Sequence, residues 1–374
     1  MSDDASQFEP APPGTAAQPE TADSPDDTGP PPEQISLARR LRSPRTIVSF
    51  VVPLALLILV AVNLEGFQLE LLPELILAAD PLLLLAAFAV YYLGFPLRGY
   101  RWQLLLRSAG TRISLRDSTE IIFLSWLVNC LVPAKLGDVY RAYLLRGNFI
   151  VSLSRTFGTV FMERVFDLFA IAILGLAAGF WSFRSGMPAE VQIVFGIGLV
   201  VMILLSVGLY TIRNFGRRTL RRLPLPRKDT ILELYERFEQ GLFAINPRQV
   251  PFLALLTAVI WATEALRLYL VVAALGFDDV HLGISGAAFV ALAASLLTAI
   301  PLTPAGLGIV EAGVVGIMTS IYGVDPTQAV AITLVDRAIS VLSVIVLGSI
   351  AYVLSSKTKG GPRQPAEIEP APAG

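Results

Sequence analysis

The sequence predicts an all-α, polytopic membrane protein. Hydrophobic residues make up 54% of the 374 residues and charged residues only 16%, whereas soluble domains carry about 25% charged residues. A helix needs about 20 apolar residues to cross the ~30 Å hydrocarbon core of a bilayer. Six apolar runs approach or exceed this length and predict six full spans: 46–64, 80–97, 156–180, 190–212, 251–275 and 328–354.

The two ends of the chain differ in composition from the rest. Residues 1–36 and 357–374 are rich in Pro and charged or small polar residues, and contain few large apolar ones. Segments of this kind cannot bury enough apolar surface to offset the entropy lost on ordering. We therefore expect a disordered tail at each end of a membrane domain that covers 37–356.

Basic residues predict which loops face the cytoplasm, because Lys and Arg concentrate in short cytoplasmic loops. The segment 65–80 carries only acidic charges, and Asp278 and Asp279 follow the fifth span, so both regions are expected outside. Arginine-rich segments at 39–45, 98–116 and 213–228 are expected inside. This pattern places both termini in the cytoplasm of a plasma-membrane protein.

Two apolar regions, 118–134 and 284–322, remain outside the six spans. Each is flanked by sequence that the charge pattern assigns to one side, so we expect each to enter the membrane and return. Proline and glycine break helices, and broken backbone at depth is tolerated where it lines a cavity. The residues expected in these re-entrant loops are Pro133, Gly137, Asp138, Pro304, Gly306 and Gly308.

The linker 213–250 between the two halves contains one amphipathic segment. In 229–245 the residues Ile231, Leu234, Phe238 and Leu242 fall on one helical face, and acidic residues lie largely elsewhere. This pattern is typical of a helix lying on the membrane surface. A helix packed against other loops explains the pattern equally well.

The chain contains an internal repeat. The motif at 97–100 (LRGY) recurs at 266–269 (LRLY), that at 133–137 (PAKLG) recurs at 304–308 (PAGLG), and Glu163-Arg164 recurs as Asp336-Arg337. The charge pattern assigns opposite orientations to the two copies, about 80–180 and 251–355. We therefore predict inverted-topology repeats, in which transporters place their sites near the midplane at broken helices.

Charged residues inside apolar helices are the candidate binding site, because an ionised group at the bilayer centre costs about 2.5–3.5 kcal/mol. Glu163 and Asp167 lie one helical turn apart, and Arg164 and Asp167 are spaced for an ion pair. Glu264 and Arg267 have the same spacing. The candidate substrate-binding residues are Arg141, Glu163, Arg164, Asp167, Glu264, Arg267, Glu311, Asp336 and Arg337.

Two interpretations of these charges stay open. In the first, they form an ion-pair network that only clamps the helices together. In the second, Arg164 and Arg337 bind an anionic headgroup, since a guanidinium group binds phosphate in a bidentate manner. The neighbouring acids would then hold each arginine while the site is empty.

The same residues carry a resemblance to a known family. The stretches LVPAKLGDVYRAYLL, SRTFGTVFMERVFDL, IPLTPAGLGIVEAGVV and VDRAISV occur in this order. Together they resemble the lysylphosphatidylglycerol synthase transmembrane region, also called the flippase-like domain family. The resemblance covers roughly 45–355.

The resemblance implies transport of a lipid. In the multiple peptide resistance factors, such a region moves aminoacylated phosphatidylglycerol to the outer leaflet, and a separate soluble domain makes the lipid. The 374 residues contain no such domain, so we expect a non-enzymatic protein. The expected substrate is an anionic phospholipid or a polyprenyl-phosphate-linked lipid, moved by a flippase or a scramblase.

Two other functions are compatible with the sequence. One is a non-catalytic membrane partner of an enzyme that modifies lipids or the cell envelope, and the other is a membrane-embedded lipid transferase. With one cysteine, Cys130, and one histidine, His281, no intrachain disulfide and no cysteine-based metal site is expected. We expect no cofactor, no metal and no nucleic-acid partner, and the oligomeric state stays open.

Overall fold

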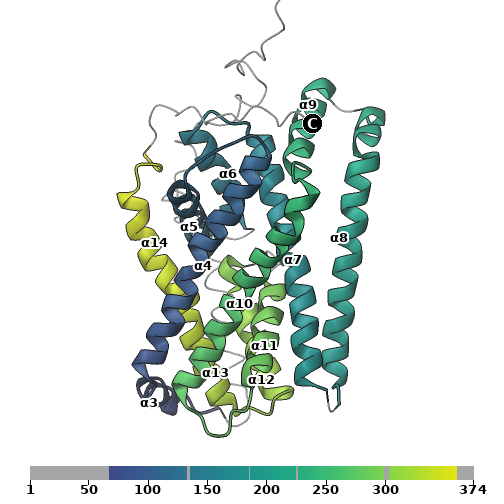
Figure 1. The fold of residues 1–374 in the computed structure, drawn as a ribbon. Helices are drawn as coiled ribbons and strands as arrows, with labels where there is room; N and C mark the ends of the chain where they lie inside the picture. Colours follow the sequence, from purple (N-terminus) through teal and green to yellow (C-terminus); the bar gives the residue numbers. More distant parts are fainter. Residues whose placement is uncertain (1–66, 133–134, 185, 225, 299–302, 360–374) are drawn as a thin grey trace, which may run out of the picture.

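Helices form almost all of the described structure, which is a computed structural model covering residues 67–132, 135–184, 186–224, 226–298 and 303–359 (Figure 1). The α-helices are α3 (Leu72–Leu77), α4 (Pro81–Ser108), α5 (Leu115–Leu131), α6 (Leu136–Asn148), α7 (Leu153–Ser182), α8 (Ala189–Arg222), α9 (Lys228–Leu242), α10 (Val250–Leu275), α11 (Gly283–Leu297), α12 (Ile309–Ser320), α13 (Pro326–Arg337) and α14 (Ser343–Leu354). Short 3₁₀ turns are η3 (Leu69–Leu71), η4 (Pro247–Gln249) and η5 (Pro304–Gly306), and a π-helical turn, η6 (Ala338–Leu342), joins α13 to α14.

Five helical segments are long and apolar enough to cross a membrane, and they match five of the six predicted spans. They are α4, α7, α8, α10 with η4, and the continuous α13–η6–α14 segment. The sixth predicted span, 46–64, lies outside the described residues. So do the predicted tail 1–36 and residues 360–374 of the other tail.

Short helices are found at both regions expected to re-enter the membrane. Residues 118–131 lie in α5, which is followed by α6, and region 284–322 contains α11 and α12. Figure 1 shows α5 and α6 in the half of the molecule that also holds α9, whereas α11 and α12 lie in the opposite half. Entry of these pairs into a bilayer stays a prediction, and Pro133 lies outside the described residues.

Helix α4 begins within one residue of the predicted span 80–97 but ends later. The Asp80 carboxylate caps its first turn, accepting hydrogen bonds from the backbone N–H groups of Leu82 and Leu83 at 2.7 and 3.2 Å. The helix then continues to Ser108, well beyond residue 97. Arg98 and Arg101 are therefore buried inside α4. The charge pattern had assigned both to a cytoplasmic loop, and this prediction is wrong.

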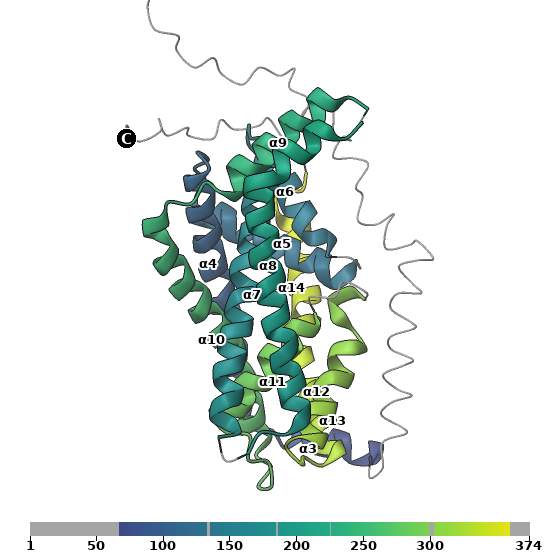
Figure 2. The ribbon, with the colours of Figure 1, turned by 90° about the vertical axis from the view of Figure 1, so that its right-hand side faces the viewer.

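Helices α4 and α10 pack along each other and join the two halves of the chain. Helix α8 lies at the edge of the molecule, in front of α7 in Figure 2. It contacts mainly α7 and α9, and most of its large apolar side chains are exposed. Such a face is typical of a helix surrounded by lipid, where apolar exposure carries no penalty.

Helix α9, which covers most of the predicted amphipathic segment, packs against α7 and α8. A Cβ atom on Gly241 would lie 2.0 Å from the carbonyl oxygen of Arg155, so the backbones of α9 and α7 are in direct contact. The hydroxyl of Tyr235 donates to the carbonyl oxygen of Ile212 in α8 at 2.8 Å. Packing against helices therefore accounts for much of the apolar face, and a position on the membrane surface stays a prediction.

The end of α14 is bound to α5 and α6 by polar contacts. Lys357 pairs with Asp117 at 2.5 Å, and Asn148 donates to the carbonyl oxygen of Lys357 at 3.0 Å. Burial alone would raise the pKa of Asp117, but hydrogen bonds from Lys357 and Ser114 hold that pKa below its usual value. The predicted tail 357–374 therefore begins with residues that make ordered contacts.

Candidate functional site

The charged residues of α7 form the centre of a buried network. Glu163 and Asp167 share one face of the helix, as their spacing predicted, and both pair with Arg101 of α4. The Arg101 guanidinium lies 3.1 Å from Glu163 and 2.7 Å from Asp167, and its side chain is only 1% exposed. Asp167 also accepts a hydrogen bond from the indole N–H of Trp261 at 3.1 Å, which links α7 to α10.

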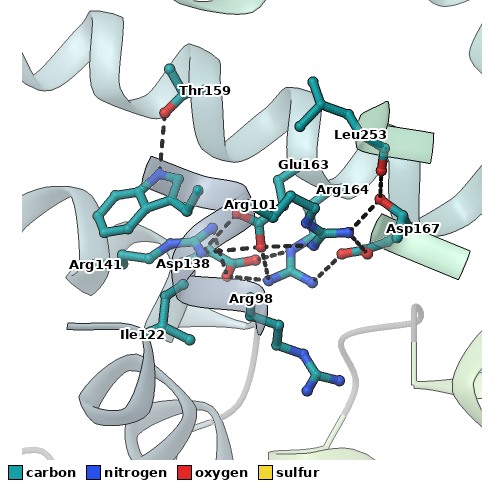
Figure 3. A network of polar contacts seen from close by, with 12 residues as sticks. Arg98, Arg101, Ile122, Asp138, Arg141, Thr159, Glu163, Arg164, Asp167 and Leu253 are labelled. Atoms are coloured by element: carbon teal, nitrogen blue, oxygen red, sulfur yellow. Dashed lines mark hydrogen bonds and ion pairs between the residues drawn. The ribbon is translucent and has the colours of Figure 1, made fainter. Parts of the chain in front are cut away.

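Helix α6 adds two further ion pairs to this network (Figure 3). Arg141 donates to both oxygens of Glu163 at 3.1 Å. Arg164 binds Asp138 through Nε and Nη2, each at 2.9 Å, and pairs with Asp167 at 3.1 Å. The predicted Arg164–Asp167 pair is therefore present, but the bidentate partner of Arg164 is Asp138.

The second half of the chain holds a similar set of pairs. Arg267 binds Asp336 at 2.8 Å and also pairs with Glu264, as the spacing predicted. Glu264 in turn accepts from Arg98 of α4 at 2.6 Å, so it links the two halves. Arg337 donates to Glu311 at 2.5 Å and to the carbonyl oxygen of Ala305 at 2.6 Å.

The arginines and carboxylates match in number. Each of the six arginines has its own carboxylate within ion-pair distance: Arg98–Glu264, Arg101–Asp167, Arg141–Glu163, Arg164–Asp138, Arg267–Asp336 and Arg337–Glu311. Since a buried charge is tolerated when it is paired and hydrogen-bonded, this matching explains how the network exists inside a membrane protein. All nine candidate binding residues belong to it.

Aromatic rings cover several of these arginines. The Arg141 guanidinium lies 4.8 Å from the ring centre of Trp102, and that of Arg267 lies 5.1 Å from Tyr91. Trp126 lies beneath two arginines, Arg98 at 5.0 Å and Arg164 at 5.6 Å. These cation–π contacts fix the orientation of the guanidinium planes in addition to the ion pairs.

A cavity of about 380 Å³ lies between the two halves and is bounded by part of the network. Its volume is in the range of small-ligand pockets, about 300–1,000 Å³. Arg164 and Arg337 both line it, so the two candidate sites open into one space instead of two separate ones. Helix α11 supplies an apolar wall that includes Ala294, and Trp126 and Trp261 contribute aromatic surface.

The charged residues that border this cavity are of both signs. They are the cations Arg98, Lys135, Arg164, Arg267 and Arg337 and the carboxylates Asp138, Asp167, Glu264 and Asp336. Glu311 is buried beside Arg337. Asp138 lines the cavity, and Glu311 pairs with Arg337, which lines it too.

Both helix breaks lie at the cavity. Helix α5 packs against η5, and residues from both breaks, including Lys135 and Gly306, line the cavity. In the second break Ala305, Gly306 and Gly308 all have positive φ angles, 51, 72 and 83°. Glycine adopts such angles without strain, which explains the glycines in this motif.

Gly137 is needed for a different reason. It is helical, but a Cβ atom there would lie 2.1 Å from the carbonyl oxygen of Ser125 in α5. Its N–H donates to the Asn129 side chain at 2.8 Å. Gly137 therefore allows the close approach of α5 and α6. Among the described residues of this break, the left-handed one is Lys135, with φ of 50°.

The predicted site residues come together, but three important residues were missing from the prediction. Arg98 and Arg101 were assigned to a loop on their charge, but α4 continues through Pro96 and carries both arginines inside the helix. Lys135 was part of the repeated motif but was not taken as a site residue. Within the described residues, no three His, Cys, Asp or Glu side chains are grouped so that they could hold a metal ion.

Comparison with known proteins agrees with the resemblance noted in the sequence. A family model described as the lysylphosphatidylglycerol synthase TM region matches residues 46–348. A UPF0104 membrane protein of Methanocaldococcus jannaschii is 36% identical over 229 residues, which cover 61% of this chain and 93% of that protein. Another, from Methanothermobacter thermautotrophicus, is 28% identical over 301 residues, 74% of this chain and 87% of that protein.

A further relative is larger. The glycosyltransferase AglD of Haloferax volcanii is 29% identical over 311 residues, which cover 74% of this chain but only 49% of AglD. This chain therefore matches about half the length of AglD. Because the family model covers most of the sequence and the described helices include five candidate membrane spans, this chain is a membrane protein of the lysylphosphatidylglycerol synthase TM region family.

Proposed function

We propose that this protein is a lipid flippase or scramblase that binds an anionic headgroup in the cavity between its two halves. The substrate would be an anionic phospholipid or a polyprenyl-phosphate-linked lipid. The observation that carries the proposal is the cavity itself, about 380 Å³ in volume and lined by both cations and carboxylates deep in an apolar helical bundle. Ionisable groups inside membrane segments typically mark a substrate path.

Inverted repeats with re-entrant helices are part of the proposal. Arg164 and Asp138 are 26 residues apart, as are Arg337 and Glu311. In each pair, an arginine from a membrane helix holds an acid in the first turn of the short helix that follows a break. The matching pairs, with the helix pairs α5–α6 and α11–α12 in opposite halves, support two copies of opposite orientation and access from either leaflet.

The basic residues support an orientation in the plasma membrane. Arg213, Arg217, Arg218, Arg221 and Arg222 are clustered towards the end of α8, and we assign this end and both termini to the cytoplasm. Single cysteines at 68 and 222 in a Cys130→Ala background test the assignment. We expect the cysteine at 68 to be labelled in intact cells and the cysteine at 222 to be labelled only after permeabilisation. Labelling of the cysteine at 222 in intact cells would contradict the assigned orientation.

A role without catalysis fits the charge arrangement, since each carboxylate of the network is held by an arginine. A second candidate is a membrane partner that presents a lipid to an enzyme. The similarity to about half of AglD, a protein named as a glycosyltransferase, favours this candidate. In that case the cavity would bind the same kind of lipid, but the purified protein alone would not exchange it between leaflets.

Lipid retention by the purified protein tests the binding step. Ala294 lines the cavity from α11, and Ala294→Trp would fill much of it. Native mass spectrometry is expected to detect a co-purified anionic lipid on the parent protein and at least tenfold less on Ala294→Trp. Ile284→Trp is the matched control, because Ile284 lies on the same helix with its side chain exposed. Equal retention by all three proteins would place the lipid elsewhere.

A further inference from the structure

Lys135 differs from the other cations of the cavity. The six arginines are matched by six carboxylates, as described above, but Lys135 forms no ion pair with any described residue while its side chain lines the cavity. An unpaired ammonium group inside a membrane protein is costly unless an anion joins it. The network is therefore one negative charge short.

The local structure holds Lys135 at the break between α5 and α6. Its backbone is left-handed, with φ of 50° and ψ of 36°, and it is the residue that precedes the first turn of α6. Helix α5, which precedes this break, packs against η5 of the second break. Lys135 therefore lies where the two breaks approach each other, at the positive end of a 13-residue helix.

Two further hydrogen-bond donors at this cavity are unsatisfied. Thr303 lines it from the second break, and its hydroxyl is buried without a hydrogen bond to any described residue. Arg98 lines it from α4, is only 3% exposed, and has one terminal nitrogen, Nη1, without an acceptor among the described residues. Buried donors normally have a partner, so an acceptor-rich ligand would complete this site.

We propose that the cavity takes a phosphodiester headgroup with a single negative charge, and that Lys135 is its charge-neutralising ligand. The inference rests on the proposed function and narrows the substrate class. A phosphodiester supplies one charge and several acceptor oxygens, which match one unpaired ammonium group and the unsatisfied donors. A phosphate monoester gains a second charge above a pKa of about 6, and that charge would be buried without a partner.

Titration calorimetry of the full-length protein in detergent tests the proposal with three water-dispersible probes. Dioctanoyl phosphatidylglycerol is the singly charged diester, dioctanoyl phosphatidic acid is the monoester, and inorganic phosphate represents a free anion. The parent protein is expected to bind the diester more tightly than the monoester. Lys135→Gln is expected to weaken binding of the diester about tenfold or more, because charged hydrogen bonds contribute more than neutral ones.

Two variants serve as controls. Lys135→Arg keeps the charge and is expected to bind the diester within about threefold of the parent. Lys359→Gln removes one positive charge at an exposed position outside the cavity and is expected to change nothing. Circular dichroism and size-exclusion elution of each variant verify that it is folded.

The outcomes separate this inference from the proposed function. If the parent binds the diester and Lys135→Gln binds it equally well, the lysine assignment is wrong while the proposed function stands. Tighter binding of the monoester would overturn the single-charge class. Binding of inorganic phosphate in place of the diester would show that the ligand is a free anion and not a lipid. A folded parent protein that binds neither lipid would contradict both the proposed function and this inference.

Discussion

Glu163→Gln is expected to destabilise the protein more than any other single change of charge. Glu163 has a fully buried side chain and pairs with both Arg101 and Arg141 at 3.1 Å. Removing its charge leaves Arg101 paired with Asp167 alone and takes from buried Arg141 the carboxylate matched to it. Breaking a buried pair in this way costs about 3–5 kcal/mol. Thermal unfolding in detergent, followed by the fluorescence of a thiol-reactive dye at buried Cys130, is expected to shift strongly downwards.

Glu236→Gln is the matched control for this change. Glu236 of α9 pairs with Arg217 at 3.6 Å, and both side chains are well exposed. An exposed pair contributes about 0–1 kcal/mol, so the unfolding temperature of this variant is expected to stay near that of the parent. A Glu163→Gln protein as stable as Glu236→Gln would show that the central network does not hold α4, α6 and α7 together.

Gly137→Leu is expected to abolish lipid transport and lipid retention. Any side chain at this position meets the backbone of α5, because a Cβ atom would lie 2.1 Å from the Ser125 carbonyl oxygen. Backbone cannot move aside as a flexible side chain can, so α5 and α6 must separate. Asp138 and Lys135, which border the cavity, would be displaced with them. The membrane spans do not depend on this contact, so insertion is expected to continue.

Gly147→Leu is the control on the same helix, because nothing lies within 4 Å of a Cβ atom at Gly147. Gly308→Leu tests the second break, where φ of 83° is strained for leucine. Both break variants are expected to lose activity while Gly147→Leu retains it. Full activity of Gly137→Leu would mean that the close packing of α5 on α6 has no part in transport.

Much of the fold could be predicted because lipid exposure leaves a strong signal in sequence. Five apolar runs correspond to five long helices, and α8 is the clearest, since its apolar side chains remain largely exposed. Prolines and glycines indicated both breaks, and the spacing of Arg164 and Asp167 indicated their ion pair. These features depend on residues close together in the chain.

The remaining features depend on contacts between distant segments. The sequence could not show that Arg101 pairs with Glu163 and Asp167, because 62 and 66 residues separate them. The positive-inside rule assigned Arg98 and Arg101 to a loop because it counts charge without regard to pairing. Lys135 was not predicted as a site residue for a related reason. Its importance follows from the absence of an ion-pair partner among the described residues, which can be seen only in the folded structure.

The sequence left two interpretations of the buried charges open, an ion-pair clamp and a binding site. In the structure each interpretation fits a different part of the charge network. Arg101 and Arg141 are fully buried and do not line the cavity, so their pairs are suited to holding helices together. Arg164 has a side chain that is 26% exposed and faces the cavity. We expect the first group to determine stability and the second, with Lys135, to determine lipid binding.

Leaflet exchange in reconstituted vesicles tests the central claim most directly. Vesicles with the purified parent protein and a fluorescent phosphatidylglycerol in both leaflets are treated with a membrane-impermeant quencher, and the loss of fluorescence is followed with time. If the protein moves an anionic lipid through its cavity, quenching is expected to pass well beyond the outer-leaflet half with the parent and with Ile284→Trp, and to stop at half with Ala294→Trp. Exchange by folded Ala294→Trp at the parental rate, or no exchange by the parent above empty vesicles, would contradict transport through this cavity.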